Sequence, residues 1–116
     1  MKELETLRDA LREFARERDW DRFHSPKNLS MALIVEAAEL VEHFQWLTQA
    51  ESLALSEDKL QKVKEELADI LIYLVRLADK LGVDLIEEAH KKIEKNSRKY
   101  PKELVKGRAD KYTEYE

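Results

Sequence analysis

The sequence contains no cysteine, and it has only two glycines and two prolines among its 116 residues. Without cysteine the chain has neither a disulfide framework nor a thiol site. With so little glycine and proline it has little material for hairpin turns, which argues against a fold rich in β-strands. The absence of cysteine agrees with a reducing compartment, and we expect a cytoplasmic protein.

The chain also lacks a long apolar run and an excess of positive charge. Glutamates interrupt its longest apolar stretches, so we expect no membrane span. The first twenty residues, MKELETLRDALREFARERDW, are too highly charged for a signal peptide. The formal net charge is −4, with acids and bases intermixed, so duplex nucleic acid is not an expected partner. A hydrophobic content of 43% can form a core, and the length predicts a single domain over residues 1–116.

What the sequence does contain is apolar residues at helical spacing. Ser25 before Pro26 is a helix start signal, because the hydroxyl can cap the helix and proline lacks only an N–H that would be unpaired there. Gly82 suits a helix end. The expected helices cover about residues 2–18, 26–47, 56–81 and 84–100, followed by an irregular tail at 101–116. Four helices with short connections predict an all-α four-helix bundle.

Two pairs of acids interrupt the most apolar of these helices. Glu36 and Glu39 lie in EAAELVEHFQW, and Glu66 and Asp69 lie in KEELADILIYLVRL. At about 100° per residue, the members of each pair are only about 60° apart on one helix face. Apolar residues occupy nearly every other direction of the first of these helices, so we expect that helix to be surrounded by protein. The acids are therefore expected to face an interior cleft.

Four carboxylates in one cleft would repel one another and resist ionisation. A divalent cation removes this conflict, and oxygen ligands favour Mg²⁺, with Mn²⁺ as a substitute, over zinc. The patterning alone therefore indicates a metal site. The alternative is that such pairs are simply solvated acids, which are common on helix surfaces.

The same residues, with their flanking segments, resemble the MazG-type nucleoside triphosphate pyrophosphohydrolases, and within them the dCTP pyrophosphatase branch. The acid-containing segments EAAELVEHFQW and EELADILIYL carry this resemblance. FARERDWDRFHSPKNL before them, and VDL, KKIEKNSRKYP and KGRADKYTEY after them, extend it over roughly residues 12–115.

The resemblance implies an all-α enzyme that hydrolyses a nucleoside triphosphate to the monophosphate and pyrophosphate. It implies Mg²⁺ held by the four acids and a role in cleansing the nucleotide pool, with dCTP or a modified dCTP favoured. It also implies an assembly, a homotetramer built as a pair of dimers, in which the C-terminal tail closes over a neighbouring site. The residues expected to contact the nucleotide are Trp20, His24, Trp46, Tyr73, Lys92 and Asn96.

Physical reasoning supports several of these roles independently. Trp20, Trp46 and Tyr73 offer flat surfaces on which a base can stack, although simple core packing would equally explain the two tryptophans. His43 follows Glu39 by one helical turn, which is the spacing of a further ligand, but the family does not require histidine there. Helices that are apolar on most sides also predict a homo-oligomer, since one small bundle cannot hide so much apolar surface.

Two other classes of protein stay open at this point. Glu87 and His90 form an E-x-x-H pair like those of di-iron carboxylate oxidases, but such proteins need this pair on two helices and the sequence offers one. A non-catalytic helical interaction protein is the other class. The position of both acid pairs within otherwise apolar helices argues against it.

Overall fold

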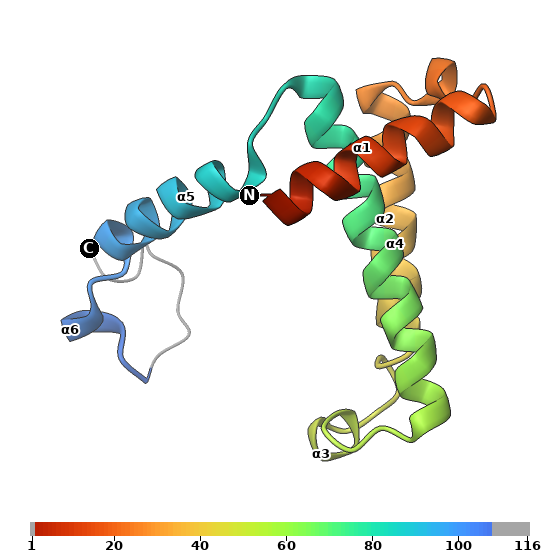
Figure 1. Cartoon of the computed structure of the whole chain (residues 1–116). Helices are drawn as coiled ribbons and strands as arrows, with labels where there is room; N and C mark the ends of the chain where they lie inside the picture. Colours follow the sequence, from red (N-terminus) through yellow and green to blue (C-terminus); the bar gives the residue numbers. More distant parts are fainter. Residues whose placement is uncertain (1, 108–116) are drawn as a thin grey trace. The chain divides into compact units, whose positions relative to one another are not determined.

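The computed structural model describes residues 2–107, and every regular element within them is helical. This confirms the all-α fold class. The long helices are α1 (Lys2–Glu17), α2 (Pro26–Glu42), α4 (Glu57–Leu81) and α5 (Leu85–Lys99). Three short elements accompany them: the 3₁₀ turn η1 (Asp21–Phe23), α3 (Gln49–Ser52) and α6 (Lys102–Val105). Figure 1 shows their order along the chain.

Side-chain caps begin four helices, namely α2, α3, α4 and α5. The Ser25 hydroxyl accepts a hydrogen bond from the Asn28 N–H at 3.1 Å, and Ser56 does the same for Lys59 at 3.2 Å. At α3, Thr48 and Glu51 form a full capping box, which the sequence analysis did not anticipate. These caps satisfy backbone donors that have no partner inside a helix, and so fix where each helix begins.

Helix α2 ends five residues earlier than expected, at Glu42 rather than at residue 47. Beyond it the backbone continues in tighter turns, with Phe44 N–H donating to Val41 O at 2.9 Å and Leu47 N–H donating to Phe44 O at 2.9 Å. Histidine, phenylalanine and tryptophan are weaker helix formers than the alanine and leucine before them, and no basic residue supports the last turn of α2. Apolar spacing alone could not show this end.

Two helices end with a residue in the left-handed conformation. Gly82 has φ +68° after α4, and the Val83 N–H reaches back to Ala78 O at 2.9 Å. Asp19 has φ +53° after α1, and the Trp20 N–H reaches Ala15 O at 2.9 Å. Both follow the Schellman pattern, which pairs otherwise free helix carbonyls. Glycine adopts this conformation without a steric penalty, whereas aspartate does not.

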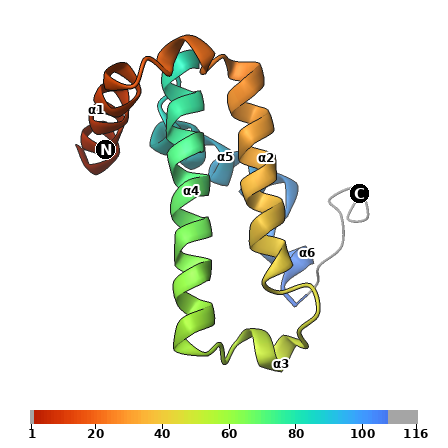
Figure 2. The same ribbon diagram turned by 90° about the vertical axis from the view of Figure 1, so that its right-hand side faces the viewer.

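The contacts divide the chain into two compact units, Met1–Val83 and Asp84–Glu116. In the first unit α2 and α4 lie side by side and antiparallel, joined through α3 at one end (Figure 2). Helix α1 also packs on α4, where the Arg12 guanidinium donates two hydrogen bonds to the Asp79 carboxylate at 2.7 and 2.5 Å. The fully buried apolar residues of this unit form a small core, which comprises Ala15, Leu29, Val63, Val75 and Ala78.

Within the unit Met1–Val83, helix α2 is not surrounded by protein, contrary to expectation. Four of its large apolar side chains are more than half exposed: Met31, Ile34, Val35 and Val41. Within the unit Met1–Val83, α4 is the helix that makes extensive contact with α2. The apolar residues predicted on nearly every side of α2 are therefore present, but this unit leaves several of them uncovered.

The second unit contains α5 and α6. Helix α5 begins at the Asp84 cap, whose carboxylate accepts from the Glu87 N–H at 3.0 Å, and it ends at Lys99, two residues before Pro101. The tail expected to be irregular from residue 101 contains α6 at its start, while residues 108–116 lie outside the described part of the chain. The expected closure of the tail over a neighbouring site falls mainly on those residues.

No helix within residues 2–107 combines the length and the apolar character that crossing a bilayer requires.

Candidate metal and nucleotide site

The antiparallel pairing of α2 and α4 brings three of the four predicted acids together. Glu36 and Glu39 come from α2, and Glu66 comes from α4. One carboxylate oxygen of each lies within 4.8 Å of the other two, and all three side chains are half-buried. Among the described residues, this is the only group of three or more acids, histidines or cysteines with such spacing. We call it the glutamate cluster.

The glutamate cluster contains carboxylate oxygens that lack a hydrogen-bond partner within residues 2–107. Glu36 Oε2 and Glu66 Oε2 are buried and have no hydrogen-bond partner among the residues that the structure describes. The His43 Nε2 atom is 3.8 Å from Glu66 Oε1, a contact that is electrostatic only when the imidazole is protonated. Buried carboxylate oxygens without a donor are costly, so these atoms are the clearest structural sign that the cluster is suited to hold a cation.

The electrostatics of the cluster follow from its geometry. Burial, followed by the proximity of Glu39, raises the pKa of Glu36 to about 7. Burial and Glu39 also raise the pKa of Glu66. A carboxylate pKa moves up when water is removed and like charges approach, because both effects disfavour the ionised form. A divalent cation would reverse this local field and hold the carboxylates in their charged state.

Asp69, the fourth predicted acid, lies on α4 one turn after Glu66 and is half-buried. It is not part of the group whose oxygens fall within 4.8 Å. Its charge nevertheless contributes to the raised pKa of both Glu36 and Glu66, so it belongs to the same electrostatic environment. Oxygen-only donors in this number fit a hard divalent cation such as Mg²⁺ or Mn²⁺, and do not suit zinc.

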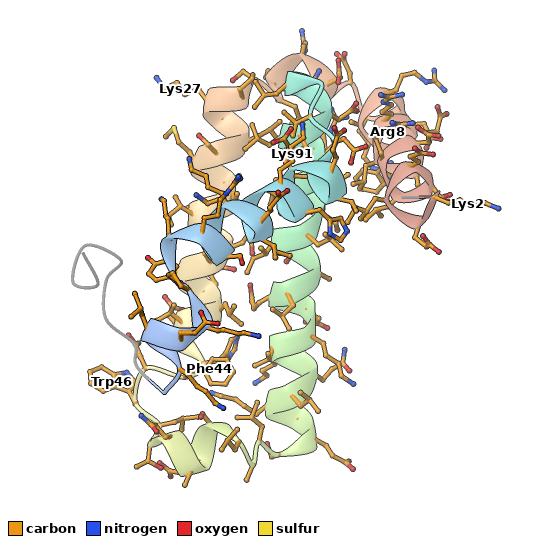
Figure 3. The ribbon with its side chains drawn as sticks, turned by 90° about the vertical axis from the view of Figure 1, so that its left-hand side faces the viewer. Lys2, Arg8, Lys27, Phe44, Trp46 and Lys91 are labelled. Atoms are coloured by element: carbon orange, nitrogen blue, oxygen red, sulfur yellow. The ribbon has the colours of Figure 1, made fainter. Side chains whose placement is uncertain are left out.

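The three aromatic residues predicted to contact a base have different surroundings. Tyr73 is half-buried on α4, one turn after Asp69. Trp20 is 47% exposed and meets the Phe14 ring edge-to-face, with ring centroids 5.7 Å apart. Trp46 is 87% exposed and projects from the turn after α2, away from α4 (Figure 3). Neither tryptophan is a core residue of the single chain, which removes the core-packing explanation for both within that chain.

His24 contacts a residue that the sequence analysis overlooked. Arg76 of α4 is 3% exposed, and its guanidinium nitrogens Nε and Nη2 lie 3.3 and 3.2 Å from His24 Nδ1. The same guanidinium donates to Asp21 Oδ1 at 2.8 Å. The available signal was an arginine within the apolar run LIYLVRLADKL, since a buried arginine needs acceptors nearby.

Lys92 and Asn96 both lie on α5, in the second unit, one helical turn apart. Lys92 is exposed and Asn96 is half-buried. Their predicted contact with a nucleotide stays a prediction. On the same helix, the Glu87 carboxylate pairs with Lys91 Nζ at 3.1 Å, and His90 is exposed. Glu87 and His90 do not join any metal-binding group among residues 2–107, so the di-iron alternative gains no support.

Comparisons with known proteins identify the family of the chain. The model of the MazG-like family matches residues 31–115. The dCTP pyrophosphatase 1 of Bos taurus is 47% identical over 113 residues, which are 96% of this chain and 67% of that protein. The human dCTP pyrophosphatase 1 is 45% identical over 113 residues and is covered to 66%. The chain therefore spans about two thirds of the length of these curated relatives.

A solved structure is similar throughout most of the chain. It is the crystal structure of a pyrophosphatase from Archaeoglobus fulgidus, which has a TM-score of 0.81 and 45% sequence identity. The match covers 85% of this chain and 93% of that one. The family match, the curated relatives and the solved structure confirm the resemblance carried by the two acid-containing segments. The chain belongs to the MazG-like family.

Proposed function

We propose that this protein is a nucleoside triphosphate pyrophosphohydrolase that converts dCTP, or a C5-modified dCTP, to the monophosphate and pyrophosphate with Mg²⁺ as its cofactor. The observation that carries the proposal is the glutamate cluster, which lies within a chain about 45% identical to proteins named dCTP pyrophosphatase 1. A role in cleansing the deoxynucleotide pool follows from that reaction. Cytoplasmic localisation stays a prediction.

The residues that would hold Mg²⁺ are Glu36, Glu39, Glu66 and Asp69. The bound cation would offset the charge of a triphosphate, which an acidic site would otherwise repel, and would lower the pKa of a water molecule. A glutamate of the cluster accepts the proton of the attacking water. The new bond forms between the water oxygen and the α-phosphorus, and the bond from that phosphorus to the bridging oxygen breaks. Pyrophosphate leaves with the electron pair.

Exposed aromatic side chains support a nucleotide as the substrate. Trp46 and Trp20 present uncovered ring surface, and Tyr73 follows the acids along α4. Base–aromatic stacking contributes about 1–3 kcal/mol per base and accepts any base, so these residues explain binding but not selection. Selection requires polar groups that pair with the base edge, and His24 and Asn96 are the candidates.

The oligomeric state is part of the proposal. We propose a homotetramer formed from two dimers, with active sites near the subunit contacts. The uncovered apolar side chains of α2 support association, because a soluble monomer seldom exposes a contiguous apolar surface of this kind.

Release of pyrophosphate from a panel of deoxy- and ribonucleoside triphosphates tests the function. We expect rapid release from dCTP with Mg²⁺ and none after treatment with EDTA. Glu39→Gln and Asp69→Asn should abolish turnover while preserving the helical circular dichroism spectrum. Glu65→Gln is the matched control, because Glu65 is exposed and points about 100° away from Glu66 along α4.

Three results would contradict parts of the proposal. Equal hydrolysis of purine triphosphates would remove the dCTP preference and keep the reaction. Normal turnover by Glu39→Gln or Asp69→Asn would remove that residue from the site. A wild-type protein that binds Mg²⁺ and releases no pyrophosphate from any nucleotide would favour a non-catalytic role.

A further inference from the structure

Arg76 is the only fully buried charged residue that the structure describes within residues 2–107, at 3% exposure. Desolvating a guanidinium is costly unless acceptors surround it. Its acceptors are Asp21 Oδ1 at 2.8 Å and His24 Nδ1 at 3.2–3.3 Å, with Asp79 Oδ2 at 3.6 Å one turn further along α4. The contact with His24 differs from the other two, because it determines which nitrogen of the imidazole ring carries the hydrogen.

An arginine side chain can only donate hydrogen bonds, and it stays protonated in proteins. The His24 Nδ1 atom must therefore accept from Arg76 with its lone pair, and cannot carry a hydrogen in this arrangement. A neutral imidazole has one N–H, so the hydrogen resides on Nε2. Within residues 2–107 the Nε2 atom makes no hydrogen bond, and this N–H remains available to a ligand.

The charges around His24 favour the same state. Arg76 and Lys80 of α4 disfavour an imidazolium, while Asp21 of η1 favours one. The Asp21 carboxylate is engaged by Lys80 Nζ at 2.7 Å and by Arg76, which hold the pKa of Asp21 at about 2. Burial and the Arg76 charge together lower the pKa of His24 below its ordinary value. His24 is consequently held in its neutral form to a lower pH than an ordinary histidine.

We infer that Arg76 is a positioning residue that fixes His24 as a neutral Nε2–H donor for an acceptor atom of the bound pyrimidine nucleotide. The inference rests on the proposed function for the identity of the ligand, but not for the state of the ring. A donor of fixed direction fits the N3 atom of cytosine, which is an acceptor. It cannot pair with N3 of uracil or thymine, which carries a hydrogen, whereas O2 is an acceptor in all three bases and would not distinguish them. Arg76 thus acts on base selection through His24 and does not itself touch the substrate.

The first test is the tautomer of His24, measured by ¹⁵N NMR of the 116-residue chain with labelled histidine. The His24 signals are assigned by their loss in His24→Asn. We expect the wild-type ring to show an unprotonated Nδ1 and a protonated Nε2 at pH 8, and to take up its second proton at a lower pH than an ordinary histidine does. Arg76→Met should give a mixture of tautomers and protonate at a higher pH. A wild-type ring with hydrogen on Nδ1, or one unchanged by Arg76→Met, would overturn the inference.

The matched control is Arg12→Met. Arg12 belongs to the same set of ion pairs through Asp79, but it does not contact His24. We expect this variant to lose stability and to keep the wild-type His24 tautomer. If Arg76→Met does not fold, Arg76→Gln replaces it, since an amide offers a donor and an acceptor and should also release the fixed tautomer. The wild-type measurement decides the central statement without any variant.

The second test is the pH dependence of kcat/KM for dCTP, expressed as the ratio of variant to wild type at each pH. For Arg76→Met we expect this ratio to lie below one at pH 8 and to return toward one at pH 5.5. A neutral ring released from Arg76 can carry its single hydrogen on Nδ1, whereas the imidazolium formed by an unconstrained histidine with a pKa near 6.5 donates from both nitrogens. In a His24→Asn background the same substitution should give a ratio that does not change with pH. A ratio that changes equally in both backgrounds would show that Arg76 does not act through His24.

The two tests separate this inference from the proposed function. Absence of any triphosphate hydrolysis by the wild type would reject the function, while the NMR measurement would still decide the state of His24. If the wild type hydrolyses dCTP and shows the expected tautomer, but the ratio of kcat/KM between Arg76→Met and wild type does not change with pH, then Arg76 has no role in substrate selection.

Discussion

The free energy of unfolding depends on pH through individual carboxylates of the glutamate cluster. The pKa of Glu36 is raised to about 7 from an ordinary value of 4.5, mainly by burial and by Glu39. Between these two pH values the folded protein binds a proton that the unfolded chain releases. The free energy of unfolding of the metal-free protein should therefore fall as the pH rises from about 4.5 to about 7. The raised pKa of Glu66 adds to this trend.

Urea denaturation of EDTA-treated protein at pH 5 and pH 8 measures the effect, and the comparison with Glu36→Gln isolates it. Relative to the wild type, the free energy of unfolding of Glu36→Gln should be higher at pH 8 than at pH 5. Added Mg²⁺ should stabilise the wild type more at pH 8 than at pH 5, because protonation competes with metal binding. A pH-independent difference between the two proteins would disprove the coupling.

Individual residues differ in how far the sequence could predict their surroundings. The acids were predictable because two E-x-x-E/D pairs interrupt apolar helices, and antiparallel packing brings three of these side chains together. The pairing of Arg76 with His24 was not predictable, since 52 residues separate them and neither has a periodic pattern. Exposure of Trp46 was equally hidden, because tryptophan is apolar by composition but lies in a turn after α2.

At the scale of helices, caps explain the boundaries better than apolar spacing does. The starts at Ser25, Ser56 and Asp84 are encoded locally by a side-chain acceptor. The end of α2 is encoded only by weak helix formers, and apolar spacing extends past it. The packing of α1 on α4 depends on Arg12 and Asp79, which are 67 residues apart. Helix type was therefore predictable, while helix ends and neighbours were less so.

The end of α4 gives a prediction at this scale. Gly82 has φ +68°, and a Cβ atom added there would meet no heavy atom within 4 Å. Gly82→Ala should therefore lower the free energy of unfolding through backbone conformation alone, by about 1 kcal/mol. Urea denaturation measures this cost. Gly82→Asn is the control, since asparagine tolerates the left-handed region and should cost less than alanine. Equal stability of the wild type and Gly82→Ala would refute this account of the helix end.

At the scale of the whole molecule, the uncovered apolar side chains of α2 predict self-association. Ile34 is 66% exposed in the single chain, so Ile34→Glu would barely affect a monomer. In an oligomer that covers α2, the same substitution buries a charge and should dissociate the assembly. Sedimentation at micromolar concentration should show a homo-oligomer for the wild type and smaller species for Ile34→Glu.

Lys27→Glu is the control for charge alone, since Lys27 lies in the first turn of α2 and is already polar and exposed. It should sediment as the wild type does. A wild-type protein that sediments as a monomer at this concentration would contradict the predicted assembly. The sequence pointed to association through composition, but only the structure identifies the side chains that a partner would have to cover.

The way in which α2 and α4 share the glutamate cluster also determines where the gene tolerates insertions and deletions. Each helix carries its acids as a rigid unit, while residues 43–56 connect the two helices through turns and α3. Two residues inserted after Leu53, which is 88% exposed, lengthen only the connection and cost little entropy. One alanine inserted between Glu66 and Leu67 turns Asp69 by about 100° relative to Glu66. Length variation among homologous genes should therefore accumulate in the connection and be absent between the paired acids.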